Sequence, residues 1–92
     1  MYRIIDNRGS GKTSRLMLLA KETDAKIACS NPSAMRQKAY AYGITGIDFI
    51  PYSDLFNGAT DPDDKIMIDE LELFIKEFID GQFVGYTLSK DD

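Results

Sequence analysis

A short glycine-rich stretch near the start of the chain is the feature that most constrains its fold. Residues 6–11 combine two glycines with Asp, Asn and Ser, a composition that predicts a loop. Residues 2–5 before it are mostly aromatic and β-branched, which favours a strand. Residues 12–22 after it contain no Gly or Pro and repeat apolar residues at helical spacing. The sequence therefore predicts a strand, a tight loop and a helix in direct succession.

The chemistry of this loop points to phosphate. Residues 9–13 read Gly-Ser-Gly-Lys-Thr, the second half of the pattern Gly, four residues, Gly-Lys-Ser/Thr of a phosphate-binding loop, or P-loop. The glycines let backbone N–H groups line one anion-sized concavity, and the helix N-terminus adds partial positive charge. Lys12 is then expected to reach the β- and γ-phosphates, and Thr13 to offer its hydroxyl to Mg²⁺. The predicted phosphate contacts are Arg8, Gly9, Ser10, Gly11, Lys12 and Thr13.

One position departs from that pattern. Where the first glycine is expected, the chain has Asp6. A carboxylate there would repel a triphosphate unless it points away or pairs with Arg8, which bears on affinity more than on fold. Arg8 and Arg15 lie near the loop, where they contact either phosphate or solvent. An alternative interpretation of the whole stretch is a glycine-rich turn with a chance Lys-Thr pair.

A second polar feature follows the apolar run at residues 65–68, which ends in Asp69 and Glu70. Beside a P-loop, Asp69 is expected to hold Mg²⁺ through water, and Glu70 to orient or deprotonate an attacking water. The alternative is that both carboxylates only cap and charge the next helix. Thr87 and Ser89 are candidates to sense the γ-phosphate, or else are ordinary strand-end residues.

Strand and helix patterns alternate through the rest of the chain. Asn31 and Pro32 are typical of a helix start, and Gly43 of a helix end. The alternation predicts an α/β fold, a single three-layer α/β/α domain over residues 1–92 with a mostly parallel sheet of four to five strands. Beyond the first strand and helix, strands are predicted at residues 26–30, 48–52, 65–68 and 83–88, and helices at residues 31–43 and 71–80.

Composition excludes several classes of function. The net charge of −4, without a basic run, argues against nucleic acid as the main direct partner. Cys29 is the only cysteine and there is no histidine, which excludes an internal disulfide and a zinc cluster of His and Cys ligands. No run approaches the ~18 apolar residues that span a bilayer, and no signal peptide is evident. We therefore expect a cytoplasmic protein without membrane partners.

With both motifs placed, the chain resembles the P-loop NTPase superfamily, and within it a minimal RecA-like or helicase-type ATPase core. Residues 8–13 resemble the Walker A motif and residues 68–71 the Walker B motif, in which a catalytic Glu follows the Asp. Residues 28–32 and 49–55 are similar to less specific segments of the same core. In general shape the chain is also similar to short P-loop proteins of bacteriophages and prophages, which implies a bacterial cytoplasm. A weaker similarity to thymidine kinases lacks that family's zinc-binding cysteines.

Two functions follow as hypotheses. The first is binding of a nucleoside triphosphate, with ATP expected, together with Mg²⁺ and with slow or partner-activated hydrolysis in which Lys12 and Glu70 are catalytic. The set that holds the nucleotide includes Ser89, and the metal ligands are Thr13 and Asp69. The second is a non-enzymatic interaction protein on a P-loop scaffold that binds a host replication or defence factor. Either one is compatible with a homo-oligomer or a protein partner, because a small sheet leaves an edge exposed.

Overall fold

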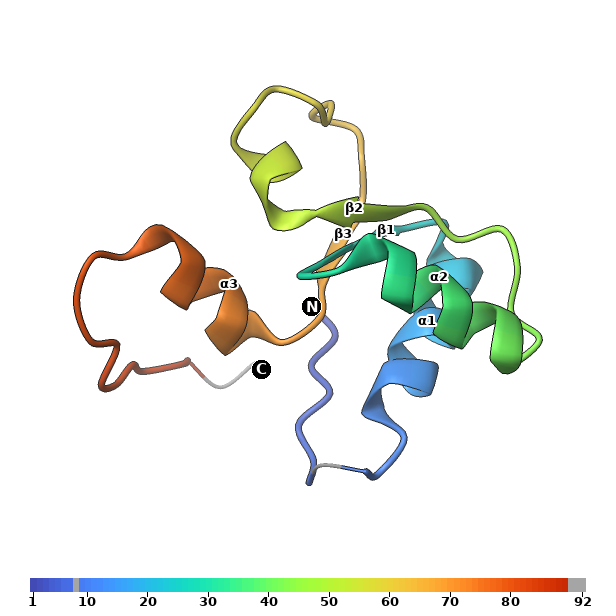
Figure 1. The fold of residues 1–92 in the computed structure, drawn as a ribbon, viewed down its shortest axis with the longest axis horizontal. Coiled ribbons are helices and arrows are strands. Elements are labelled where there is room, and N and C mark those ends of the chain that lie inside the picture. The colour runs from blue at the N-terminus through green and yellow to red at the C-terminus, as the bar shows by residue number, and fades with distance from the viewer. Residues whose placement is uncertain (8, 90–92) are drawn as a thin grey trace.

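In the part of the chain that the structure describes, three α-helices, three strands and one short 3-10 helix make up the fold (Figure 1). The computed structural model describes residues 1–7 and 9–89. The strands are parallel and lie in the order β2-β1-β3. In chain order the elements are α1 (Lys12–Thr23), β1 (Lys26–Cys29), α2 (Pro32–Ala41), β2 (Phe49–Pro51), the short 3-10 helix η1 (Tyr52–Leu55), β3 (Ile66–Ile68) and α3 (Leu71–Phe78).

Strand β1 is the centre of the sheet, and its side chains alternate between the two faces. Ile27 pairs in register with Phe49 of β2 and Met67 of β3, and these three side chains share one face. Ala28, next along β1, pairs with Ile50 and Ile68 on the opposite face. Both faces are apolar because a parallel sheet in a three-layer fold is covered on both sides.

Helices α1 and α2 cover one face of the sheet, and η1 and α3 lie on the other (Figure 1). The α1/α2 face carries the larger buried cluster: Met17, Ala20, Ala25, Ile27, Cys29, Met35, Ala39, Ile44 and Phe49. The α3 face buries only Ala28, Ile50 and Tyr52, with Leu55, Ile66, Ile68 and Phe74 half-buried around them. The predicted three-layer α/β arrangement is therefore present, with unequal outer layers.

Local sequence signals explain where α2 begins and ends. The Asn31 side chain accepts a hydrogen bond from the Ala34 N–H (3.1 Å), which satisfies one of the four unpaired donors at the helix start. At the other end, Gly43 adopts a left-handed φ of 73°, and the N–H of Ile44 donates to the Ala39 carbonyl (2.8 Å). This is a Schellman C-cap, in which the αL residue is usually glycine. The predicted boundaries of this helix are confirmed.

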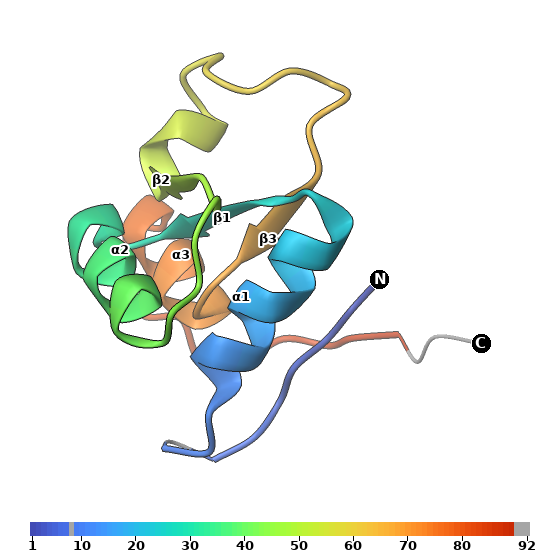
Figure 2. The ribbon, with the colours of Figure 1, turned by 90° about the vertical axis from the view of Figure 1, so that its right-hand side faces the viewer.

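The outermost predicted strands differ from the observed structure. Residues 2–5 and 83–88 form neither helix nor strand, so the sheet has three strands in the described part of the chain instead of four to five. The N-terminal residues run outside the sheet (Figure 2), and Ile5 is 82% exposed. The strand pattern in both segments is local, whereas pairing requires a partner edge distant in the chain.

Shape follows from this packing. The radius of gyration is 13.7 Å, against about 12 Å expected for a compact domain of this length. The N-terminal segment, which runs outside the sheet, is one part of the chain that lies away from the core. Within the described residues, no helix has the length and apolar character needed to cross a bilayer.

Candidate phosphate-binding site

The loop before α1 has the backbone geometry that its glycines predict. Gly9 and Gly11 adopt left-handed φ angles of 79° and 83°, which side chains with a Cβ rarely adopt. Gly11 is the N-cap of α1, and it has no side chain with which to satisfy the first N–H groups. The first turn of α1 also carries no acidic residue. The start of the helix therefore keeps donors and partial positive charge available to an anion.

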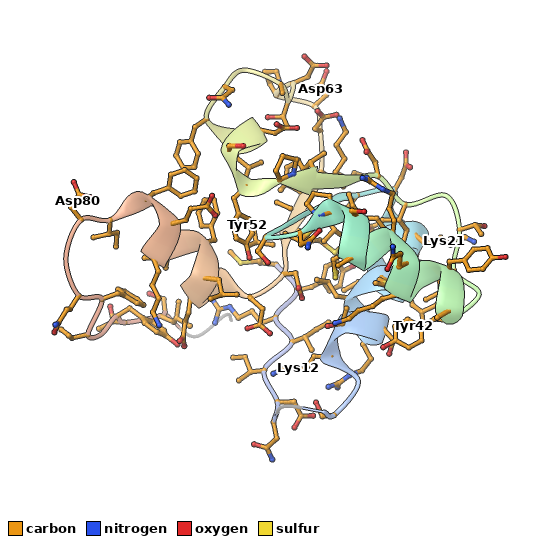
Figure 3. The ribbon with its side chains drawn as sticks, viewed as in Figure 1. Lys12, Lys21, Tyr42, Tyr52, Asp63 and Asp80 are labelled. Atoms are coloured by element: carbon orange, nitrogen blue, oxygen red, sulfur yellow. The ribbon has the colours of Figure 1, made fainter. Side chains whose placement is uncertain are left out.

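Lys12 is folded back over this loop. Its Nζ donates a hydrogen bond to the backbone carbonyl of Asp6 (2.9 Å), so the ammonium lies across the two ends of the loop. Figure 3 shows Lys12 where the loop meets α1. Thr13, the expected hydroxyl ligand of Mg²⁺, follows it and is half-buried. The acceptor in this exposed contact is an uncharged carbonyl, and an anionic phosphate oxygen would be a stronger acceptor for the same ammonium.

The partner of the Asp6 carboxylate is Arg15. Arg15 Nη2 lies 3.0 Å from Asp6 Oδ2, and the Asn7 N–H donates to Oδ1 at 2.8 Å. The Asn7 N–H and the Arg15 guanidinium hold the pKa of Asp6 below its ordinary value. The predicted pairing of Asp6 with Arg8 cannot be compared, because Arg8 lies outside the described residues. Arg15 neutralises the charge that the sequence places in the loop, and it is not merely solvated.

The carboxylate pair follows directly on β3. The Asp69 N–H donates to the Ala28 carbonyl (2.9 Å), which extends the ladder between β3 and β1 by one residue. Glu70 then turns the chain with φ 58° and ψ 72° and serves as the N-cap of α3 without a side-chain hydrogen bond to it. The Glu70 carboxylate therefore does not cap α3, as the alternative interpretation of this pair would require.

Burial and charge set the electrostatics of Asp69. Its pKa is raised above the ordinary value, chiefly by burial and then by the neighbouring Glu70 carboxylate. The ammonium groups of Lys38 and Lys12 act in the opposite direction. The charge of the Lys12 ammonium therefore acts on the Asp69 carboxylate. Figures 1 and 2 agree in placing the start of α1 and the turn after β3 toward the same end of the molecule.

The γ-phosphate sensor expected at Thr87 or Ser89 is not brought to this region. Both residues are exposed in the segment that follows α3 and forms no strand. In both ribbon views the end of the described chain lies apart from the loop before α1 (Figure 2). A contact of Ser89 with nucleotide stays a prediction that would require this segment to move.

Two residues near the acidic turn were not predicted as part of the site. Lys38 is an exposed residue of α2 whose charge acts on Asp69. Tyr52, labelled in Figure 3, is 2% exposed, and its hydroxyl donates to the backbone carbonyl of Asp69 at 2.5 Å. The sequence contains only an indirect signal for Tyr52, a residue with a polar tip that comes directly after an apolar strand.

Comparisons with protein families, with curated proteins and with solved structures found no match to this chain.

Proposed function

We propose that the chain binds the triphosphate of a nucleoside triphosphate, with ATP as the expected nucleotide, on a P-loop NTPase type of fold. The observation that carries the proposal is the loop before α1, where Lys12 folds over two left-handed glycines at a helix start without a side-chain cap. Backbone N–H groups, a helix dipole and an ammonium converge there, and each of them favours a bound phosphate.

The donor set also fits Mg²⁺ as the accompanying ion. Hard oxygen ligands from one or two side chains, completed by water and phosphate oxygens, are what Mg²⁺ takes in sites of this kind. Thr13 and Asp69 would hold the ion, and Mg²⁺ supplies charge neutralisation at the β- and γ-phosphates. The described residues contain no group of three or more His, Cys, Asp or Glu side chains suited to a metal. In this proposal Mg²⁺ is held by Thr13 and Asp69 together with phosphate oxygens of the bound nucleotide.

Glu70 is the proposed general base, and turnover is expected to be slow in the isolated chain. After Asp69 the only basic residues are Lys76 and Lys90, and neither is an arginine. An arginine supplied by a second subunit or a partner accelerates phosphoryl transfer by about 10³–10⁵ in NTPases that depend on one. We expect hydrolysis to rise on assembly. Glu70→Gln should keep nucleotide affinity and slow hydrolysis, which a phosphate-release assay measures.

Isothermal titration with Mg²⁺–ATP and Mg²⁺–GTP tests the proposal. Lys12→Ala should weaken binding by at least about 100-fold, since it removes a charge-assisted contact from the phosphates. Lys21→Ala is the matched control, because Lys21 is an exposed lysine in the last turn of the same helix. Absence of binding by the wild type at millimolar nucleotide, or equal affinity of the two lysine variants, would contradict the proposal.

A second candidate function is protein interaction through α3, and the exposure of its apolar residues favours it. Leu71, Leu73, Phe78 and Ile79 are each 43–47% exposed, and Phe56 beside them is 60% exposed. Phe56 and Phe78 adjoin one another, with 4.2 Å between ring centroids, and adjoining exposed apolar side chains commonly mark a protein interface. If the interface joins copies of this chain, Phe78→Lys should shift sedimentation toward a monomer and leave nucleotide affinity unchanged. A wild type that is monomeric at high micromolar concentration, with and without nucleotide, would exclude self-association.

A further inference from the structure

Tyr52 connects the end of β2 to the acidic turn after β3. It is the first residue of η1 and is almost completely buried, at 2% exposure. Its ring packs edge-on against Phe74 of α3, with 5.3 Å between ring centroids and 80° between ring planes. The ring therefore sits between the sheet and α3, as Figure 3 shows.

The Tyr52 hydroxyl is directed at the backbone of the two residues that carry the carboxylates. It donates to the Asp69 carbonyl at 2.5 Å and lies 3.3 Å from the Glu70 carbonyl. Burial, and then the nearby Asp69 carboxylate, raise the pKa of Tyr52, so the hydroxyl keeps its proton and remains a donor. A phenylalanine would fill the same space in the core. What the tyrosine adds at this position is therefore its hydroxyl and the hydrogen bond to the turn.

The turn needs such a contact because its backbone is strained. Glu70 has φ 58°, a left-handed conformation that costs a residue with a Cβ about 1–2 kcal/mol. Its carbonyl also accepts the N–H groups of Leu73 (3.0 Å) and Phe74 (3.2 Å), which begin α3. Strained residues of this kind persist only where surrounding contacts hold them. Here one buried hydroxyl fixes the peptide units on both sides of Glu70.

We propose that Tyr52 is a positioning residue for the metal–triphosphate site, which holds the turn at Asp69 and Glu70 so that their carboxylates face the loop of Lys12. This inference rests on the proposed function. Tyr52 does not touch the nucleotide and acts through the backbone of the two acidic residues. It follows that loss of the hydroxyl should weaken the part of nucleotide affinity that depends on Mg²⁺, and spare the part that the loop alone provides.

The first experiment measures ATP affinity by calorimetry with Mg²⁺ and with EDTA in its place, for wild type, Tyr52→Phe and Tyr40→Phe. Tyr40 is the matched control, because it is a tyrosine of α2 that is 83% exposed. Tyr52→Phe should weaken Mg²⁺–ATP binding about tenfold and metal-free ATP binding by less than about twofold, in keeping with one lost hydrogen bond. Tyr40→Phe should change neither. An equal loss under both conditions, or no loss, would overturn the positioning role.

The second experiment needs no nucleotide. Amide hydrogen exchange at Leu73 and Phe74, whose N–H groups bond to the Glu70 carbonyl, should accelerate about tenfold in Tyr52→Phe, whereas exchange at Met35 in α2 should not. Unchanged exchange at these two amides would overturn the inference by itself. Accelerated exchange at Met35 as well would show global destabilisation and count against a local role.

A rescue variant separates positioning from packing. Asn tolerates left-handed φ better than Glu, so Tyr52→Phe/Glu70→Asn should regain most of the Mg²⁺-dependent affinity. Failure of this rescue, with both variants folded, would overturn the role assigned to the turn. If the wild type binds no nucleotide in either buffer, the proposed function fails and this inference fails with it. A wild type that binds, with a Tyr52→Phe variant that shows no metal-specific loss, leaves the proposed function standing and overturns the inference alone.

Discussion

The two faces of the sheet differ in how completely they are covered. On the face of α1 and α2, nine buried residues form one continuous cluster, and Met17 and Ile27 are fully inaccessible to solvent. On the face of α3, three residues are buried and α3 itself contains no buried residue. Because hydrophobic stabilisation is roughly proportional to the apolar area removed from water, most of the stability resides on the first face.

This difference separates the two halves of the candidate site. The loop of Lys12 directly precedes α1, and α1 packs on the well-covered face of the sheet. The carboxylates of Asp69 and Glu70 lie between β3 and the thinly packed α3. The turn there is held by the hydrogen bond from the Asp69 N–H to β1, by the Tyr52 hydroxyl and by the packing of Tyr52 against Phe74. We therefore expect the proposed phosphate half of the site to be rigid and the proposed metal half to respond to binding or to assembly.

Removal of core volume from the packed face should produce the largest effect. Ile27→Ala should lower the free energy of unfolding by about 3 kcal/mol, since it deletes a fully buried side chain from the centre of the sheet. Leu73→Ala on α3, where the side chain is 47% exposed, should cost less than about 1 kcal/mol. Urea denaturation measures both values. Similar losses for the two variants would mean that the faces contribute equally, which would contradict the comparison.

Alkaline pH should also act through the packed face. Burial raises the pKa of the Cys29 thiol to about 11, from 9.0 in an exposed thiol. A group whose pKa is higher in the folded state contributes stability that is complete below pH 9.0 and is lost as pH rises toward 11. The loss should reach about 2 kcal/mol at the upper end. Denaturation of wild type and Cys29→Ala at several pH values isolates this contribution, and parallel pH profiles for the two proteins would contradict it.

The helix starts on the two faces provide a smaller contrast. Asn31 caps α2 through its side chain, whereas α3 begins at Glu70 with no such bond. Asn31→Ala should therefore cost about 1 kcal/mol. Ser33→Ala is the control, because Ser33 is an exposed polar residue in the first turn of the same helix. Thermal denaturation distinguishes them, and a Ser33→Ala loss as large as that of Asn31→Ala would exclude capping as the cause.

The helices, strands and turns of this chain that were predicted correctly are those marked by sequence patterns that span only a few residues. The Asn31-Pro32 start and the Gly43 end of α2, and the helical spacing that begins at Leu71, are all local, and each marks an observed element. The left-handed backbone at Gly9 and Gly11 follows from the same kind of signal. All three strands between residues 26 and 68 were also predicted, within two residues at each end.

Contacts between distant residues could not be predicted in this way. Residues 2–5 have strand composition but form no strand, because composition does not determine which edge, if any, a segment pairs with. Asp6 pairs with Arg15 across nine positions of the chain, once α1 turns that side chain back to the loop. The Tyr52 hydroxyl reaches a carbonyl 17 positions away. Each of these contacts depends on the completed fold, and two of them bear directly on the site.

Strain at Glu70 leads to the smallest predicted effect and to the most direct link between stability and function. Glycine adopts φ 58° without the penalty of a Cβ, so Glu70→Gly should stabilise the fold by about 0.5–1 kcal/mol. Glu70→Ala also removes the carboxylate but keeps the Cβ, so it should give no gain, and the difference between the two variants in urea denaturation measures the backbone contribution. Equal stability of the Gly and Ala variants would show that the turn stores no strain. A gain specific to glycine would mean that the chain keeps a destabilising glutamate beside the weaker face of its sheet, as expected if the carboxylate is retained for chemistry.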